Sequence, residues 1–127
     1  AFDNTFSGFK LTGRNAGAAL AQWQIVCLNS SSQWVLADAN GSGTYPARGI
    51  ALAATSSGAA ATIGIKGIVR NDAWNWTPGG AIYMSGTAGG VTQTAPSTTG
   101  DKVQLIGFAI TADIAYLDFN STFVEVA

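Results

Sequence analysis

The sequence predicts an all-β protein, a single-domain antiparallel β-barrel or sandwich of about nine or ten short strands. Short apolar segments recur with turn residues roughly every 8–12 positions, a spacing typical of such folds. Several segments alternate apolar and polar residues at period two, and none sustains a period of 3.6. The 127 residues correspond to one domain, and 47% hydrophobic residues suffice for a core.

The expected strands are separated by segments rich in Gly, Ser, Thr, Asn and Pro, which favour turns. They cover residues 22–29, 33–38, 48–54, 61–71, 81–85, 91–95, 102–110, 114–119 and 122–126. The first two form a β-hairpin around a Ser-rich turn. In its first strand, Trp23, Ile25 and Cys27 share one side. In the loop that follows the hairpin, Tyr45 precedes Pro46, and this raises the chance of a cis peptide bond, with trans as the default.

The chain is organised around the stretch from Gly64 to Met84, which predicts a strand, a corner and a second strand. In residues 61–71 the alternate small and apolar residues fall on one face, with Ile68 as an exception on the other. That face consists of Ala61, Ile63, Ile65, Gly67 and Val69. We expect the core to contain Ile63, Ile65, Val69, Val103, Leu105 and Leu117.

The corner carries two tryptophans, Trp74 and Trp76, with Tyr83 nearby. If the segment is extended, both indoles point the same way. Three interpretations remain open: a hydrophobic corner of the fold, an anchor against a neighbouring subunit, or a stacking platform for sugar rings.

Residues 1–15 are expected to form an N-terminal arm, and residues 16–127 the β domain. The arm carries Phe2, Phe6 and Phe9 among residues that form helices poorly. Three aromatic rings are too many for a free tail, so the arm is expected to dock onto a neighbour. The alternative is a terminal strand of the same domain.

Charge is sparse and balanced: 10% of residues are charged, against ~25% in ordinary domains. A surface so poor in charge suggests either that a partner covers much of it or that the chain is an ordinary secreted domain with a surface of Ser, Thr and Gly. The sequence contains no cluster of basic residues, so binding to nucleic acid or to anionic lipid is not expected. Residues 49–65 carry no charge, but polar residues interrupt them and they fall short of the ~20 apolar residues of a membrane span. The first residues fit either removal of an initiator Met or cleavage of a leader.

The sequence offers little chemistry. It has no histidine and one cysteine, Cys27, in an apolar context, so nucleophile–base pairs and Cys/His zinc sites are not expected. The acidic residues are scattered, and only Asp113 and Asp118 lie within five positions of each other, which is a weak pattern for calcium. We therefore expect neither an enzyme nor a cofactor or metal site.

From about Gln22 onward, the chain resembles β-rich structural modules of tailed-phage virion proteins, of the capsid decoration (cement) or head and tail-fibre type. The matching pieces are QIVCLNSSSQWVLADA, YPARGIALAA, GIKGIVRNDAWNWTPGGAIYMS and GGVTQTAPSTTGDKVQLIGFAI. The resemblance covers about four fifths of the chain, through short motifs. It implies a non-enzymatic virion component that oligomerises, with a trimer as one option, and that contacts a major capsid or tail protein after synthesis in the host cytoplasm. The resemblance assigns no binding residues to positions of this chain.

The sequence therefore favours a structural assembly protein of a virion. The candidate interface residues are Phe2, Phe6, Phe9, Trp74, Trp76 and Tyr83. The alternatives are a carbohydrate-binding β module that uses Trp74 and Trp76, with a glycan as its ligand, and a subunit of an extracellular filament.

Overall fold

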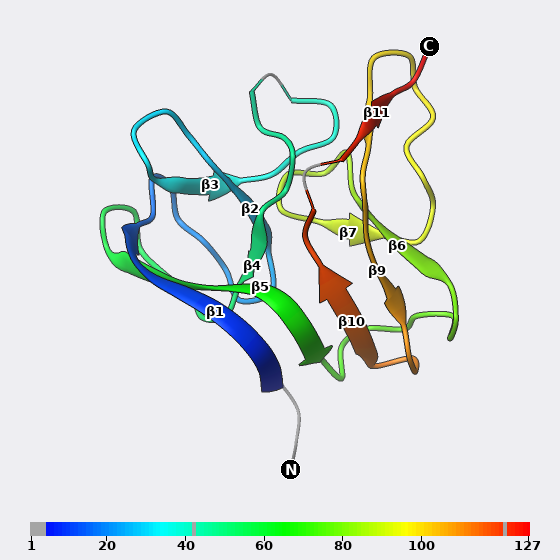
Figure 1. Cartoon of the computed structure of the whole chain (residues 1–127), viewed down its shortest axis with the longest axis horizontal. Helices are drawn as coiled ribbons and strands as arrows, with labels where there is room; N and C mark the ends of the chain where they lie inside the picture. The colour runs from blue at the N-terminus through cyan, green and yellow to red at the C-terminus, as the bar shows by residue number, and fades with distance from the viewer. Residues whose placement is uncertain (1–4, 42, 121) are drawn as a thin grey trace.

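Strand β5 (Ala60–Arg70) runs through the middle of a nine-stranded sheet and connects its two halves (Figure 1). In this computed structural model, the described residues 5–41, 43–120 and 122–127 form eleven strands and no helix. The predicted single all-β domain is confirmed, with the antiparallel sheet curled into a half-barrel. No helix among the described residues is long and apolar enough to cross a membrane.

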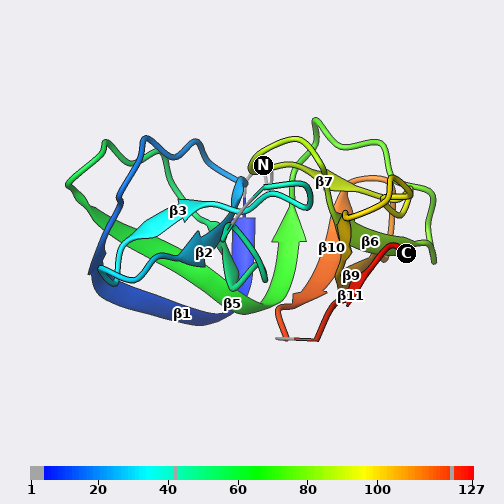
Figure 2. The same cartoon turned by 90° about the horizontal axis from the view of Figure 1, so that it is seen from above.

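One half of the sheet lies before β5 in the strand order, and the other half lies after it (Figure 2). The first half contains β3 (Trp34–Leu36), β2 (Ile25–Leu28) and β4 (Gly49–Ala51). The second contains β10 (Ile114–Asp118), β9 (Leu105–Ala109), β6 (Ala81–Met84) and β7 (Val91–Thr92). A separate two-stranded sheet pairs β8 (Lys102–Val103) with β11 (Val124–Glu125).

Strand β1 (Thr5–Asn15) pairs antiparallel with almost the whole of β5. Because β1 occupies one edge of β5, β4 and β10 follow each other along the opposite edge. Residues 5–15, expected to belong to an arm, thus form a strand of the same sheet, as in the terminal-strand alternative.

The two halves also meet at the turn between β6 and β7. The Ile25 N–H donates to the Gly89 carbonyl at 2.9 Å, and the Gly89 N–H donates to the Ala37 carbonyl at 2.8 Å. The Ala39 N–H donates to the Ser85 carbonyl at 3.0 Å. These bonds between backbone groups hold the sheet in its curl.

The curl encloses a large apolar cluster, here called the inner cluster. Its buried members are Trp23, Ile25, Cys27, Ala37, Ala39, Ala47, Ile50, Val69, Ile82, Met84, Ile106, Ala109, Ala115, Leu117 and Phe119. A second cluster lies on the opposite face of the first half and contains Ala16, Leu20, Val26, Trp34, Ala51, Ala61 and Ile63. Strand β2 is therefore buried on both faces, since Ile25 and Cys27 face the inner cluster and Val26 faces the second one.

A β-bulge in β5 switches which face its side chains occupy. In the pairing with β1, Phe9 lies opposite Lys66 and the next pair joins Lys10 to Gly64, which leaves Ile65 without a register partner. A β-carbon at Gly64 or at Gly67 would lie within 2.8–3.0 Å of the Phe6 ring, so these two positions share a face although they are three positions apart, where strict alternation would place them on opposite faces.

The prediction of a single apolar face for residues 61–71 is therefore wrong. Ala61 and Ile63 belong to the second cluster, Ile65 packs against it, and Val69 belongs to the inner cluster. The extra residue at the bulge reverses the alternation, because a shift of one residue moves side chains to the other face.

A second bulge, in β9, shows that the prediction of Leu105 in the core is wrong. Ile82 pairs with Gly107 and Tyr83 pairs with Leu105, so Ile106 is the extra residue. Leu105 is consequently 51% exposed and Ile106 is fully buried, the reverse of strict alternation.

The other predicted core residues divide into two groups. Ile63, Val69 and Leu117 are buried, as predicted. Ile65 and Val103 are only partly buried.

Gln104 is a fully buried polar residue that ties three segments together. Its side chain accepts from the Ala47 N–H at 2.7 Å and donates to the carbonyls of Ala47 at 2.9 Å and Asn120 at 2.7 Å. Burial of an amide is tolerated when its hydrogen bonds are made. The Tyr45–Pro46 peptide bond, next to this contact, is cis.

Lys102 attaches β11 to the rest of the fold. Its Nζ lies 2.9 Å from the Glu125 carboxylate and donates to the Gly100 carbonyl at 2.7 Å. The nearby Glu125 raises the pKa of Lys102 above its ordinary value of 10.5. The ammonium also lies 4.7 Å from the centre of the Tyr45 ring.

The bulge in β9 predicts that two neighbouring substitutions lower the free energy of unfolding by very different amounts. Ile106→Ala should lower the free energy of unfolding by about 2–5 kcal/mol, because it empties a buried site. Leu105→Ala should cost less than about 1 kcal/mol, since half of that side chain already faces water. Urea unfolding followed by far-UV circular dichroism measures both, and equal costs would contradict the bulge.

Candidate functional site

The face of β5, β10 and β9 that points away from the inner cluster, here called the outer face, carries a row of aligned side chains. Ser7 pairs with Ile68, Ile68 with Tyr116, Tyr116 with Phe108, and Phe108 with Ala81. Paired residues in a sheet share a face, so the row crosses five strands on one side.

The middle of this row is apolar and exposed. Ile68 is 44% exposed and Phe108 is 47% exposed, and Leu105 lies beside them on β9. The Phe108 and Tyr116 rings are 5.6 Å apart between centroids and tilted by 42°. We call Ile68, Leu105, Phe108 and Tyr116 the outer patch. Large exposed apolar side chains in contact with one another are characteristic of binding surfaces.

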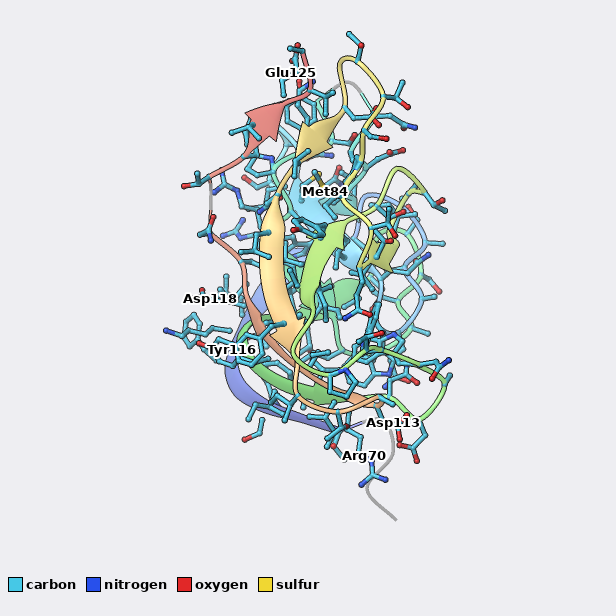
Figure 3. All side chains as sticks on the ribbon, turned by 90° about the vertical axis from the view of Figure 1, so that its right-hand side faces the viewer. Arg70, Met84, Asp113, Tyr116, Asp118 and Glu125 are labelled. Atoms are coloured by element: carbon cyan, nitrogen blue, oxygen red, sulfur yellow. The ribbon has the colours of Figure 1, made fainter. Side chains whose placement is uncertain are left out.

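A groove with a volume of about 320 Å³ lies on the β9 side of the outer patch. Its lining combines the two aromatic rings with polar and small residues: Gly79, Ala81, Leu105, Gly107, Phe108, Tyr116, Asp118 and Asn120. Figure 3 shows Tyr116 and Asp118 projecting from the same side of the sheet. The groove thus combines aromatic rings with the polar side chains of Asp118 and Asn120, which follow Tyr116 along the chain.

The polar side chains of the groove have unused hydrogen-bonding capacity. Within the described residues, the Asp118 carboxylate accepts no hydrogen bond and forms no ion pair, although Lys66 is its register partner on β5. The Asn120 side-chain oxygen accepts from the Thr122 N–H at 2.9 Å, which directs its amide nitrogen elsewhere. A carboxylate and an amide are therefore available to a ligand.

The tryptophan corner is built into the fold. The Trp74 and Trp76 rings lie 5.3 Å apart, and both are half-buried against the inner cluster. The Trp76 N–H of the backbone donates to the Ala112 carbonyl at 2.9 Å. Its indole nitrogen is buried and has no partner among the described residues. These contacts favour the interpretation of a hydrophobic corner over an open platform for sugars.

The remaining candidate interface residues are dispersed. Phe6 packs against the inner cluster, whereas Phe9 is 60% exposed on the outer face. Tyr83 is half-buried and paired with Leu105 and Thr92. Phe2 lies outside the described residues. The predicted residues therefore do not form one site, and their role in an interface stays a prediction.

Metal-ligating side chains do not cluster in the part of the chain that the structure describes. No group of three or more His, Cys, Asp or Glu side chains among these residues could hold a metal ion. Cys27 is buried in the inner cluster, and this burial raises the pKa of its thiol. A raised pKa lowers the thiolate fraction, so Cys27 is a poor nucleophile.

No protein-family model, curated protein or solved structure matches this chain. The candidate site is therefore defined by geometry and side-chain chemistry.

The position of the two tryptophans predicts a stability cost for their removal. Trp74→Ala and Trp76→Ala should each lower the free energy of unfolding by about 1–2 kcal/mol, part of the ~1.5–3 kcal/mol of a fully buried large side chain. Phe9→Ala is the matched control at an exposed ring and should cost less than either. If all three variants unfold at the same urea concentration, the corner is a free surface and not part of the core.

Proposed function

We propose that this chain is a non-enzymatic structural subunit of a virion, of the capsid decoration or head- and tail-associated type, and that it assembles through β1 and the adjoining outer face. The observation that carries this proposal is the exposure of β1. Ten of its eleven residues are exposed, and only Phe6 is half-buried. Backbone pairing with β5 holds β1 in place, and most of its side chains remain free for a neighbour.

The exposed side chains of β1 include large apolar ones. Phe9 is 60% exposed and Leu11 is 42% exposed, on a chain whose charged residues amount to 10%. Burial of such a side chain by a partner gains part of the roughly 1.5–3 kcal/mol that full burial is worth. An assembled particle supplies such partners, either further copies of this chain or a major capsid or tail protein.

The structure of β1 favours contact through its face rather than the addition of another strand at its edge. Its pairing is interrupted by two register shifts, one between Phe9 and Lys10 and one between Leu11 and Arg14. Bulges and lysines on an edge strand oppose edge-to-edge pairing. The neighbour is therefore expected to pack its side chains on Phe9 and Leu11.

Substitution of two phenylalanines of β1 should distinguish an effect on assembly from an effect on stability. Phe9→Ser should leave the melting temperature nearly unchanged and reduce oligomerisation and incorporation into particles, because the ring is exposed. Phe6→Ser should instead lower the melting temperature, because that ring packs against the inner cluster. Light scattering after size-exclusion chromatography measures the oligomer, and cosedimentation with particles measures incorporation.

The location of the chain tests the virion assignment itself. Cryo-electron microscopy of particles from the source of the gene should show the chain on the capsid or tail surface, with Phe9 buried against a neighbour. A monomer that never cosediments with particles, or Phe9→Ser particles with full occupancy, would contradict the proposal.

A further inference from the structure

The groove beside the outer patch has the two-sided chemistry of a sugar site. Its lining holds the Phe108 and Tyr116 rings, 5.6 Å apart, together with the Asp118 carboxylate and the Asn120 amide. A pyranose ring has an apolar face of C–H groups and an edge of hydroxyls. The electron-rich faces of aromatic rings attract such C–H groups, and a carboxylate accepts hydrogen bonds from hydroxyls.

The volume and lining of the groove suit a small ligand. Its 320 Å³ lies at the lower end of the range for small-molecule sites, roughly 300–1,000 Å³. The lining beside the rings is small, since Gly79 and Ala81 contribute to it. A β-carbon at Gly107 would collide with the Tyr116 carbonyl, so the two strands approach each other closely beneath the rings.

The charge at the groove favours a neutral ligand over an anionic or a purely apolar one. Asp118 is the acidic residue of the lining, and no basic residue lines the groove, although Lys66 pairs with Asp118 on the neighbouring strand. The lining itself therefore offers no cation to a phosphate or another anion. A purely apolar ligand or protein side chain would cover Asp118 and leave its charge without a hydrogen bond, which is costly. A neutral ligand with hydroxyl groups satisfies both the rings and the carboxylate.

We propose that the groove between β9, β10 and the segment before β6 binds a neutral saccharide, with one ring stacked on Tyr116 and Phe108 and its hydroxyls bonded to Asp118 and Asn120. This site is distinct from the tryptophan corner. The inference goes beyond the assembly role and does not depend on it.

An NMR titration of the wild-type chain tests this site. Cellotriose, mannotriose, chitotriose and lactose serve as neutral probes at up to about 10 mM, where even a millimolar site is mostly occupied. At least one probe should shift the backbone amides of Gly107, Phe108 and Tyr116 in a saturable manner. Sialyllactose, which adds a carboxylate to lactose, should bind no better than lactose.

Three variants assign the contacts. Tyr116→Ala and Asp118→Asn should each weaken binding of the responding probe by about tenfold or more, since each removes one half of the proposed recognition. Phe9→Ala removes an exposed ring of the outer face that is not part of the groove lining, and should leave binding unchanged. All three residues are exposed or half-buried, and retained amide dispersion verifies that each variant folds.

Several outcomes would overturn the inference. These are the absence of a saturable shift with every neutral probe, shifts confined to the indoles of Trp74 and Trp76, and equal affinity of Asp118→Asn and the wild type. Shifts in the groove that depend on protein concentration alone would identify a second copy of the chain as its occupant and would equally overturn the saccharide site. Failure of this test leaves the Phe9 experiment unaffected, so the two proposals are judged separately.

Discussion

The bulge at Ile65 is the constraint on which the rest of the structure depends. One additional residue in β5 lets Ile63 pack in the second cluster and Val69 in the inner cluster, within one uninterrupted strand. Because β1 occupies the other edge, β4 and β10 pair successively with the same edge of β5. A straight strand with strict alternation would have placed both apolar sets on one face and left one cluster without its central strand.

The same bulge determines which surface is left open. In the first half of the sheet, the outer side is covered by the chain itself, since Ala16 and Leu20 belong to the second cluster and the backbones of Leu20 and Thr55 are joined by two hydrogen bonds of 2.9 Å. In the second half, no described segment covers Ile68 and Phe108, which stay exposed. The outer patch is therefore the uncovered continuation of a face that is buried elsewhere. The proposed saccharide groove lies beside this patch, and the proposed assembly contact uses Phe9 on the neighbouring strand β1.

The sequence predicts the architecture well where alternation is regular. The hairpin of β2 and β3 and the shared face of Ile25 and Cys27 agree with the structure. Trp23 reaches the same cluster from the turn before β2, with a φ of 70°, and not from the strand itself. Alternation fails at the bulges, because an extra residue is fixed by the partner strand and not by its own sequence. For this reason strict alternation wrongly places Leu105 in the core. The bulge does not explain why the exposed Phe108–Tyr116 pair is missing from the predicted site, because both residues lie in regularly alternating segments. The alternation of Tyr116 and Asp118 with Ala115 and Leu117 is the pattern that would have indicated it.

Methyl NOE measurements on Ile63, Ile68 and Val69 test the switch of faces most directly. We expect the Ile63 methyls to contact protons of the second cluster, Trp34 among them, and the Val69 methyls to contact Phe6 and Leu117. The Ile68 methyls should contact Tyr116 and remain accessible to a paramagnetic probe in solvent. Shared NOE partners for Ile63 and Val69, or an Ile68 side chain shielded from the probe in the isolated monomer, would contradict the account.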